Sequence, residues 1–90
     1  MLLSIIYKSN IMEAFETTLT GSDGTIDGIA TPVKNSSFKQ VYEFISLDDS
    51  LHLTIAQDAD GKWIRIAGTQ PYFPGWVDQL AEQILVENKK

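Results

Sequence analysis

The chain contains no cysteine and only one histidine among its 90 residues. The lack of thiols excludes disulfide bonds, a thiolate nucleophile, a zinc finger and an iron–sulfur cluster. Transition-metal sites generally need two or more imidazole or thiolate ligands, so His52 alone leaves little for such a site. We therefore expect neither a metal nor another cofactor.

Basic side chains are also scarce. There are 7 lysines and arginines against 12 aspartates and glutamates, which gives a formal net charge of −5. Nucleic acids and anionic membranes need clustered lysine and arginine, so we expect neither as a partner. The apolar stretch at residues 1–7 ends at Lys8, is too short to span a bilayer and lacks the basic region of a signal peptide. The sequence therefore predicts a cytoplasmic protein.

The length allows one folded domain, residues 1–90, and no second one. Apolar residues make up 43% and charged residues 21% of the chain, a balance typical of globular proteins and not of disordered ones. Turn signals recur at short intervals, at residues 21–24, 34–37, 48–50 and 58–61. This spacing is typical of antiparallel strands joined as hairpins.

The clearest hairpin joins strands at residues 51–57 and 62–69, where aliphatic residues occur at alternate positions. If residues 58–61 form a four-residue turn, Gln57 pairs with Lys62. This register brings apolar residues of both strands to one face of the sheet. The pairs predicted across that face are Ile55 with Ile64 and Leu53 with Ile66.

The preceding strand, at about residues 38–47, carries apolar side chains on both faces. A two-residue turn at residues 48–49 places Phe44 opposite Leu53, and a slip of one residue would exchange the faces of this strand. The predicted core face holds Tyr42, Phe44, Leu53, Ile55, Ile64 and Ile66. The opposite face holds Val41, Glu43, Ile45, His52, Thr54, Ala56, Trp63, Arg65 and Ala67.

Residues 25–33 predict a further strand, with Pro32 at a sheet edge or at the end of the strand. Residues 10–20 allow two interpretations. Apolar residues at four-residue spacing fit a helix, whereas alternation and closely spaced threonines favour a strand, which we prefer. The resulting hairpin pairs Leu19 with Ile26 and Phe15 with Ala30.

The C-terminal segment predicts a helix. Pro74 suits the first turn, and Asp78 lies toward the positive end of the helix dipole. An apolar stripe should lie across the core face of the sheet; it consists of Val77, Leu80, Ala81, Ile84 and Leu85. The predicted fold class is therefore α+β, an antiparallel β-meander of four to six strands with a C-terminal α-helix packed across one sheet face.

In the expected register Glu43, Thr54 and Arg65 form a polar row across three strands, with His52 beside it. A histidine can act as a general base, but no set of nucleophile, base and orienting group is complete here. The simplest interpretation of the row is a surface ion pair across a threonine. The functional interpretation is the polar floor of a ligand or partner site.

Three aromatic residues, Tyr72, Phe73 and Trp76, lie among two prolines at the junction between the last strand and the helix. An exposed rigid aromatic cluster would suit a binding site. The interpretation that we favour is structural: Phe73 and Trp76 fix the helix to the sheet, and the Tyr72 hydroxyl stays in water.

The face around the polar row combines an aromatic residue and an arginine with aliphatic residues, as the centres of interfaces do. The N-terminal element, a second copy in a homodimer or a small molecule could cover it. Since no catalytic set is complete, we expect a non-catalytic binding or accessory domain that acts through protein–protein contact and self-associates. The alternative is a small-ligand-binding protein or simple enzyme with a pocket between helix and sheet. The candidate binding residues are Glu43, His52, Trp63, Arg65, Tyr72, Phe73 and Trp76.

Overall fold

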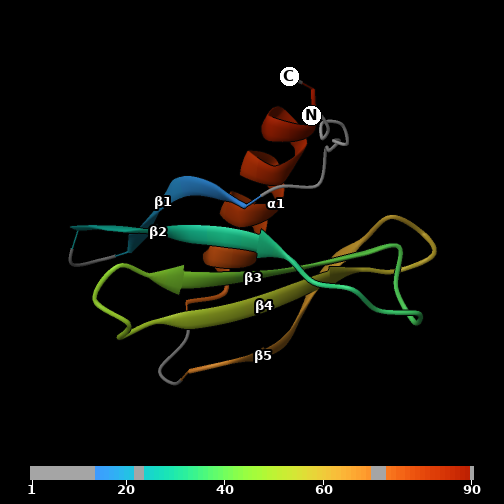
Figure 1. Cartoon of the computed structure of the whole chain (residues 1–90), viewed down its shortest axis with the longest axis horizontal. Coiled ribbons are helices and arrows are strands. Elements are labelled where there is room, and N and C mark those ends of the chain that lie inside the picture. The colour runs from blue at the N-terminus through green and yellow to red at the C-terminus, as the bar shows by residue number, and fades with distance from the viewer. Residues whose placement is uncertain (1–13, 22–23, 70–72, 90) are drawn as a thin grey trace, which may run out of the picture.

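The computed structural model describes residues 14–21, 24–69 and 73–89. Five antiparallel strands pair in the order in which they occur along the chain, and a helix follows them across one face of the sheet (Figure 1). The predicted α+β meander with a C-terminal helix is therefore confirmed. The elements are β1 (Phe15–Gly21), β2 (Gly24–Pro32), β3 (Gln40–Ser46), β4 (His52–Gln57), β5 (Trp63–Gly68) and α1 (Gly75–Asn88).

The hairpin of β1 and β2 has the predicted register, with Leu19 opposite Ile26 and Phe15 opposite Ala30. The strand interpretation is thus confirmed for residues 15–20, while residues 10–13 lie outside the described residues. The second strand ends at Pro32, whose ring nitrogen cannot donate to a further ladder bond.

The register between β3 and β4 is also as predicted. Phe44 lies opposite Leu53, and the backbone N–H of Ser46 donates to the carbonyl of Leu51 at 2.9 Å. Asp49 closes the turn with a φ of 65°. Aspartate adopts this left-handed conformation more readily than most residues, so the turn forms without glycine.

The last hairpin differs from the prediction by one residue. The N–H of Asp58 donates to the carbonyl of Lys62 at 2.9 Å, so the loop between them has three residues instead of four. Gly61 supplies the positive φ, 88°, that such a loop needs. The Asp58 carboxylate supports it by accepting from the N–H groups of Asp60 and Lys62.

The shorter loop exchanges the faces of β5, because neighbouring residues of a strand point to opposite sides. Trp63 lies opposite Gln57 and turns toward the helix, whereas Ile64 lies opposite Ala56 on the other face. The predicted pairs of Ile55 with Ile64 and of Leu53 with Ile66 are therefore wrong.

A β-bulge shifts the register once more, between Thr54 and Ile55. Beyond it Gly68 lies opposite Leu53 with a φ of 150°, and a Cβ there would be 2.6 Å from the carbonyl oxygen of His52. Ile66 lies at the bulge and is 43% exposed, so its predicted place in the core is also wrong.

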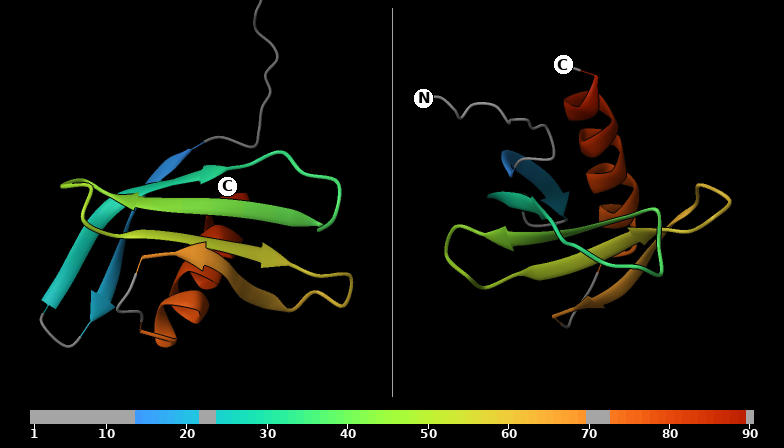
Figure 2. Two further views of the ribbon diagram at one scale, coloured as in Figure 1. Left: turned by 90° about the horizontal axis from the view of Figure 1, so that it is seen from below. Right: turned by 45° about the vertical axis from the view of Figure 1, so that its right-hand side comes forward.

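The core lies between the helix and one face of the sheet. The helix contacts both edge strands, β1 and β5, and so spans the sheet from edge to edge (Figure 2). Val77, Leu80 and Ile84 are buried as predicted, but Leu85 is 57% exposed, which corrects its place in the stripe. The sheet contributes the buried residues Leu19, Ala30, Tyr42, Phe44, Leu51, Leu53 and Ile55.

Asp48 organises the turn between β3 and β4. Its carboxylate accepts from the Ser50 hydroxyl at 2.6 Å, from the Ser50 N–H at 3.0 Å and from the Ser46 hydroxyl at 2.8 Å. These bonds, those from Ser50 first, lower the pKa of Asp48 from 3.8 to about 2. The stabilisation is therefore present above the unfolded-state pKa and is lost as the pH falls through the folded-state pKa.

We expect Asp48→Asn to remove this acid-sensitive part of the stability. Between about pH 5 and about pH 2 the melting temperature of the wild type should fall further than that of the variant. Thermal unfolding followed by circular dichroism measures the difference. Asp60→Asn, in the other acidic turn, is the control and should keep the wild-type slope. An unchanged acid dependence in Asp48→Asn would contradict the assignment.

Candidate binding surface on the open face of the sheet

The sheet face opposite the helix, which we call the outer face, has no other described element in front of it (Figure 2, left). In an antiparallel ladder, paired residues point to the same side, so the register assigns its members. They are Glu16, Thr18, Thr20, Thr25, Asp27, Ile29, Thr31, Val41, Glu43, Ile45, His52, Thr54, Ala56, Ile64 and Ala67.

Aliphatic side chains from β2, β3, β4 and β5 form a patch within this outer face. Ile29 and Ile45 are paired and half-buried, and Ile64 is also half-buried beside the buried Ala56 and Val41. A sheet with one solvated face normally alternates apolar residues inside with polar residues outside. The outer face departs from that rule across β2, β3, β4 and β5.

Two predicted site residues belong to the outer face. Glu43 lies opposite Thr54, and His52 lies opposite Ile45. His52 Nε2 is 2.8 Å from Oδ1 of Asp49, so this imidazole is held by the turn beside it. The predicted row is nevertheless broken, because the neighbour of Thr54 on β5 is Ala67 and not Arg65.

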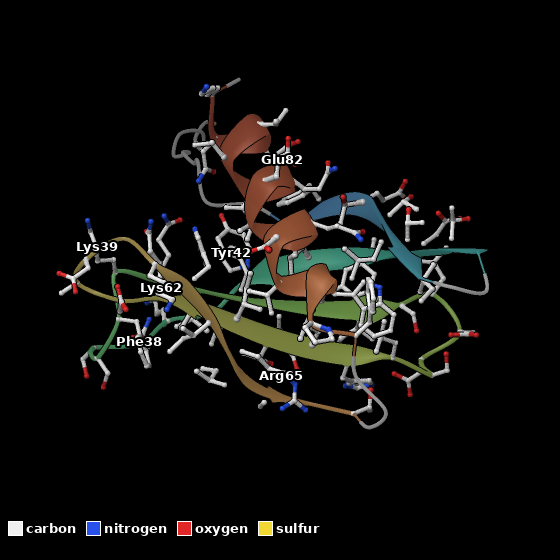
Figure 3. The ribbon with its side chains drawn as sticks, turned by 180° about the vertical axis from the view of Figure 1, so that it is seen from behind. Phe38, Lys39, Tyr42, Lys62, Arg65 and Glu82 are labelled. Carbon is white, nitrogen blue, oxygen red and sulfur yellow. The ribbon has the colours of Figure 1, made fainter. Side chains whose placement is uncertain are left out.

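Trp63 and Arg65 lie on the helix side of the sheet, which corrects their predicted place. The Trp63 ring is 6.5 Å from that of Tyr42, in an edge-to-face arrangement, and Trp63 packs against the core (Figure 3 labels Tyr42). Burial raises the pKa of the Tyr42 hydroxyl. A hydrogen bond with Asn88 lowers this pKa, and the negative charge of Glu87 raises it further. Trp63 therefore packs against the core of its own chain instead of forming an open binding surface.

At the aromatic junction Trp76 makes the structural contact that we favoured, whereas Phe73 is 45% exposed. The Phe73 and Trp76 rings lie 5.8 Å apart, edge to face. The Trp76 indole N–H donates to the carbonyl of Thr20 at 3.2 Å, which ties the start of the helix to β1. Tyr72 lies outside the described residues.

The edges of the sheet are partly occupied by side chains. The carboxamide of Gln79 accepts from the N–H of Thr20 at 2.7 Å and donates to its carbonyl at 3.0 Å, as an added strand would do. On β5, Arg65 Nη2 donates to the carbonyl of Gly68 at 3.1 Å. Such contacts hinder edge-to-edge pairing with another chain. Sequence reasoning missed Gln79, because nothing in the sequence separates it from a solvated helix residue.

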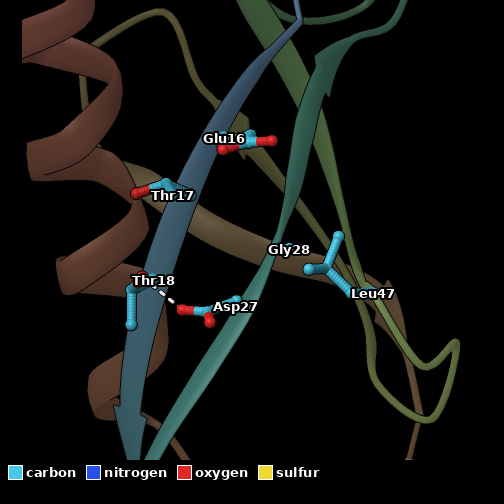
Figure 4. Close-up of a pocket in the computed structure, with 6 residues that line it drawn as sticks. All are labelled: Glu16, Thr17, Thr18, Asp27, Gly28 and Leu47. Carbon is cyan, nitrogen blue, oxygen red and sulfur yellow. Dashed lines mark hydrogen bonds between the residues drawn. The ribbon is translucent and has the colours of Figure 1, made fainter.

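Two hollows lie at opposite ends of β3. One, of about 540 Å³, is lined by Pro32, Val33, Lys34, Asn35, Lys39, Gln40 and Val41. The other, of about 320 Å³, is shown in Figure 4 and is lined by Glu16, Thr17, Thr18, Asp27, Gly28 and Leu47. In it the Thr18 hydroxyl donates to Asp27 at 2.7 Å. Neither hollow was predicted.

The described residues bring together no group of three metal-ligating side chains. None of the described helices is long and apolar enough to cross a membrane. Comparison of the chain with protein-family models, curated proteins and solved structures gives no match, so its role must be inferred from its own residues.

Proposed function

We propose that this chain is a non-catalytic protein-binding domain of the cytoplasm that self-associates through its outer face. The observation that supports the proposal is the aliphatic patch on the outer face, which holds the half-exposed Ile29, Ile45 and Ile64. Leu47, 68% exposed, and Val33, 40% exposed, extend it at its two ends. Removing such surface from water is the usual driving force of protein association.

Association through the face fits the molecule better than association through an edge. Gln79 already occupies the main-chain groups of Thr20 on β1, and Arg65 binds the carbonyl of Gly68 on β5. Two sheets that pack face to face keep their own ladders intact and bury the side chains between them. A second copy can therefore cover the outer face without rearranging the sheet.

The size of the face indicates a weak complex. Five strands spaced about 4.8 Å apart, each about six residues long, make a face of about 20 Å by 20 Å. This is at the lower end of the areas found in specific protein interfaces. We therefore expect a dissociation constant of about 10 μM or higher, and a monomer–dimer equilibrium that depends on concentration.

A ligand pocket between helix and sheet, the alternative function, has no observation in its favour. The large side chains in that space, among them Tyr42, Phe44 and Leu80, are fully buried against one another. The two hollows described above lie elsewhere, at the ends of β3.

Ile45→Asp tests the proposal at the centre of the outer face. It should raise the dissociation constant at least about tenfold, because dimer formation would bury an unpaired carboxylate. Sedimentation equilibrium from about 10 μM to about 1 mM measures the change. Ala67→Asp, at an exposed outer-face position, is a second variant that disturbs the fold less.

Leu85→Asp is the matched control, since Leu85 is 57% exposed on the helix and lies away from the outer face. It should leave the dissociation constant unchanged. Circular dichroism checks that all three variants are folded. A wild-type chain that stays monomeric throughout the concentration range would contradict self-association. Equal weakening by Leu85→Asp would contradict the choice of face.

A further inference from the structure

Charge is unevenly distributed along the sheet. Exposed carboxylates gather at the end where β3 turns into β4, which we call the acidic end; they are Glu16, Asp27, Asp48 and Asp49. Lysines gather at the opposite end, which we call the basic end: the loop from β2 to β3 carries Lys34 and Lys39, and the loop before β5 carries Lys62 together with two carboxylates, Asp58 and Asp60. Figure 3 shows Lys39 and Lys62 close together at that end.

Each end also carries a hollow with apolar side chains in its lining. At the acidic end the exposed Leu47 shares a hollow with Glu16 and Asp27 (Figure 4). At the basic end the lining of the larger hollow includes two valines, Lys34 and Lys39. An exposed aliphatic side chain with carboxylates beside it thus complements, in charge, a hollow lined by valines and lysines.

We propose that the occupant of the outer face is a second copy of this chain turned end for end, so that the acidic end of each copy meets the basic end of the other. This inference rests on the proposed function. Leu47 of each copy then enters the hollow of its partner, and Lys34 and Lys39 face Glu16 and Asp27. A two-fold axis repeats every contact, and closes the assembly at two copies.

Electrostatics favour this orientation over the parallel one. If the two outer faces packed together with both copies in the same direction, the acidic end of one copy would meet the acidic end of the other. Like charges at an interface oppose association. The whole chain carries a net charge of −5, so two copies repel each other at long range. Local pairing of opposite ends reduces that repulsion, whereas pairing of like ends adds to it.

The salt dependence of association distinguishes attraction between opposite ends from repulsion between the net charges of the two copies. The screening length falls from about 8 Å at 0.15 M ionic strength to about 3 Å at 1 M. If opposite ends attract, sodium chloride should weaken the dimer over this range. If only the net charge of the chains mattered, the same salt would strengthen it.

Charge reversal provides the decisive experiment. The double variant Lys34→Glu with Lys39→Glu makes both ends acidic, and Glu16→Lys with Asp27→Lys makes both ends basic. Each variant alone should self-associate at least about tenfold more weakly than the wild type. Mixed in equal amounts, the two should form a heterodimer about as tight as the wild-type dimer, because both contacts again join opposite charges. Sedimentation velocity with one variant fluorescently labelled measures all three equilibria.

The matched control is the pair Glu82→Lys and Lys89→Glu, whose positions are exposed at the helix (Figure 3 labels Glu82). Reversal there should change no equilibrium, alone or in mixture. Suppose that the wild type dimerises and that Ile45→Asp prevents dimerisation. If the charge reversals at the sheet ends then have no effect, or the mixture associates no better than each variant alone, the end-for-end arrangement is wrong while the outer-face contact stands. A wild type that never dimerises overturns the proposed self-association itself.

Discussion

Gly28→Ala should lower the free energy of unfolding by about 3 kcal/mol. A Cβ at this position would lie 2.5 Å from Cζ of Phe44 and 2.6 Å from the carbonyl oxygen of Ile45. The Phe44 ring is fully buried and cannot turn aside, so β2 and β3 would have to separate locally. For a small domain this is a large part of a total stability of roughly 5–10 kcal/mol.

Urea denaturation of the variant measures this loss, and Gly21→Ala is its control. A Cβ at Gly21 would come no closer than 3.3 Å to Trp76, and its unfolding free energy should change by less than about 1 kcal/mol. In a Phe44→Leu background the cost of Gly28→Ala should fall, since the ring that it meets is gone. Equal costs at the two glycines, or strictly additive effects with Phe44→Leu, would show that the ring does not fill this space.

Trp63→Ala should also be strongly destabilising, by about 3 kcal/mol. Trp63, the first residue of β5, packs edge to face on the buried Tyr42 and against the core. Ile66→Ala should cost less than about 1 kcal/mol, because Ile66 lies at the bulge and is 43% exposed. The register expected from the sequence pattern implies the reverse order, with Ile66 in the core and Trp63 outside it.

Chemical denaturation of the two alanine variants decides between these registers. A larger loss for Ile66→Ala than for Trp63→Ala would mean that β5 has the register with the four-residue loop. Trp63→Phe serves as a conservative comparison, because it keeps an aromatic ring against Tyr42 and should recover part of the lost stability.

The first four strands could be read from the sequence because two independent signals agreed there. Alternation placed Phe44 and Leu53 on one face, and the turn at residues 48–49 led to the same register. In β5 the same two signals also agreed, but on a register that is wrong by one residue. Its residues are apolar at nearly every position, so alternation could not correct an error of one residue in the loop.

The binding surface could be predicted only in part, for the same reason. Glu43 and His52 are on the outer face because the register of their strands was right. Trp63 and Arg65 were misplaced together, as members of one shifted strand. The hollow at Lys34 and Lys39 gave no local signal, because it forms where the loop after β2 folds back beside β3.

Local pattern was thus sufficient for the kinds and order of the elements, for the cysteine-free and acidic character of the chain, and for the helix that covers one face. These properties depend on composition, on residue periodicity and on turn residues that act within a few positions of one another. Long-range packing settled which face β5 presents, how Gln79 blocks the edge at Thr20, and how charge divides between the ends of the sheet. One residue more or less in a loop decides which side chains of the following strand point to the core. Here Asp58 pairs with Lys62, which shortens the loop by one residue.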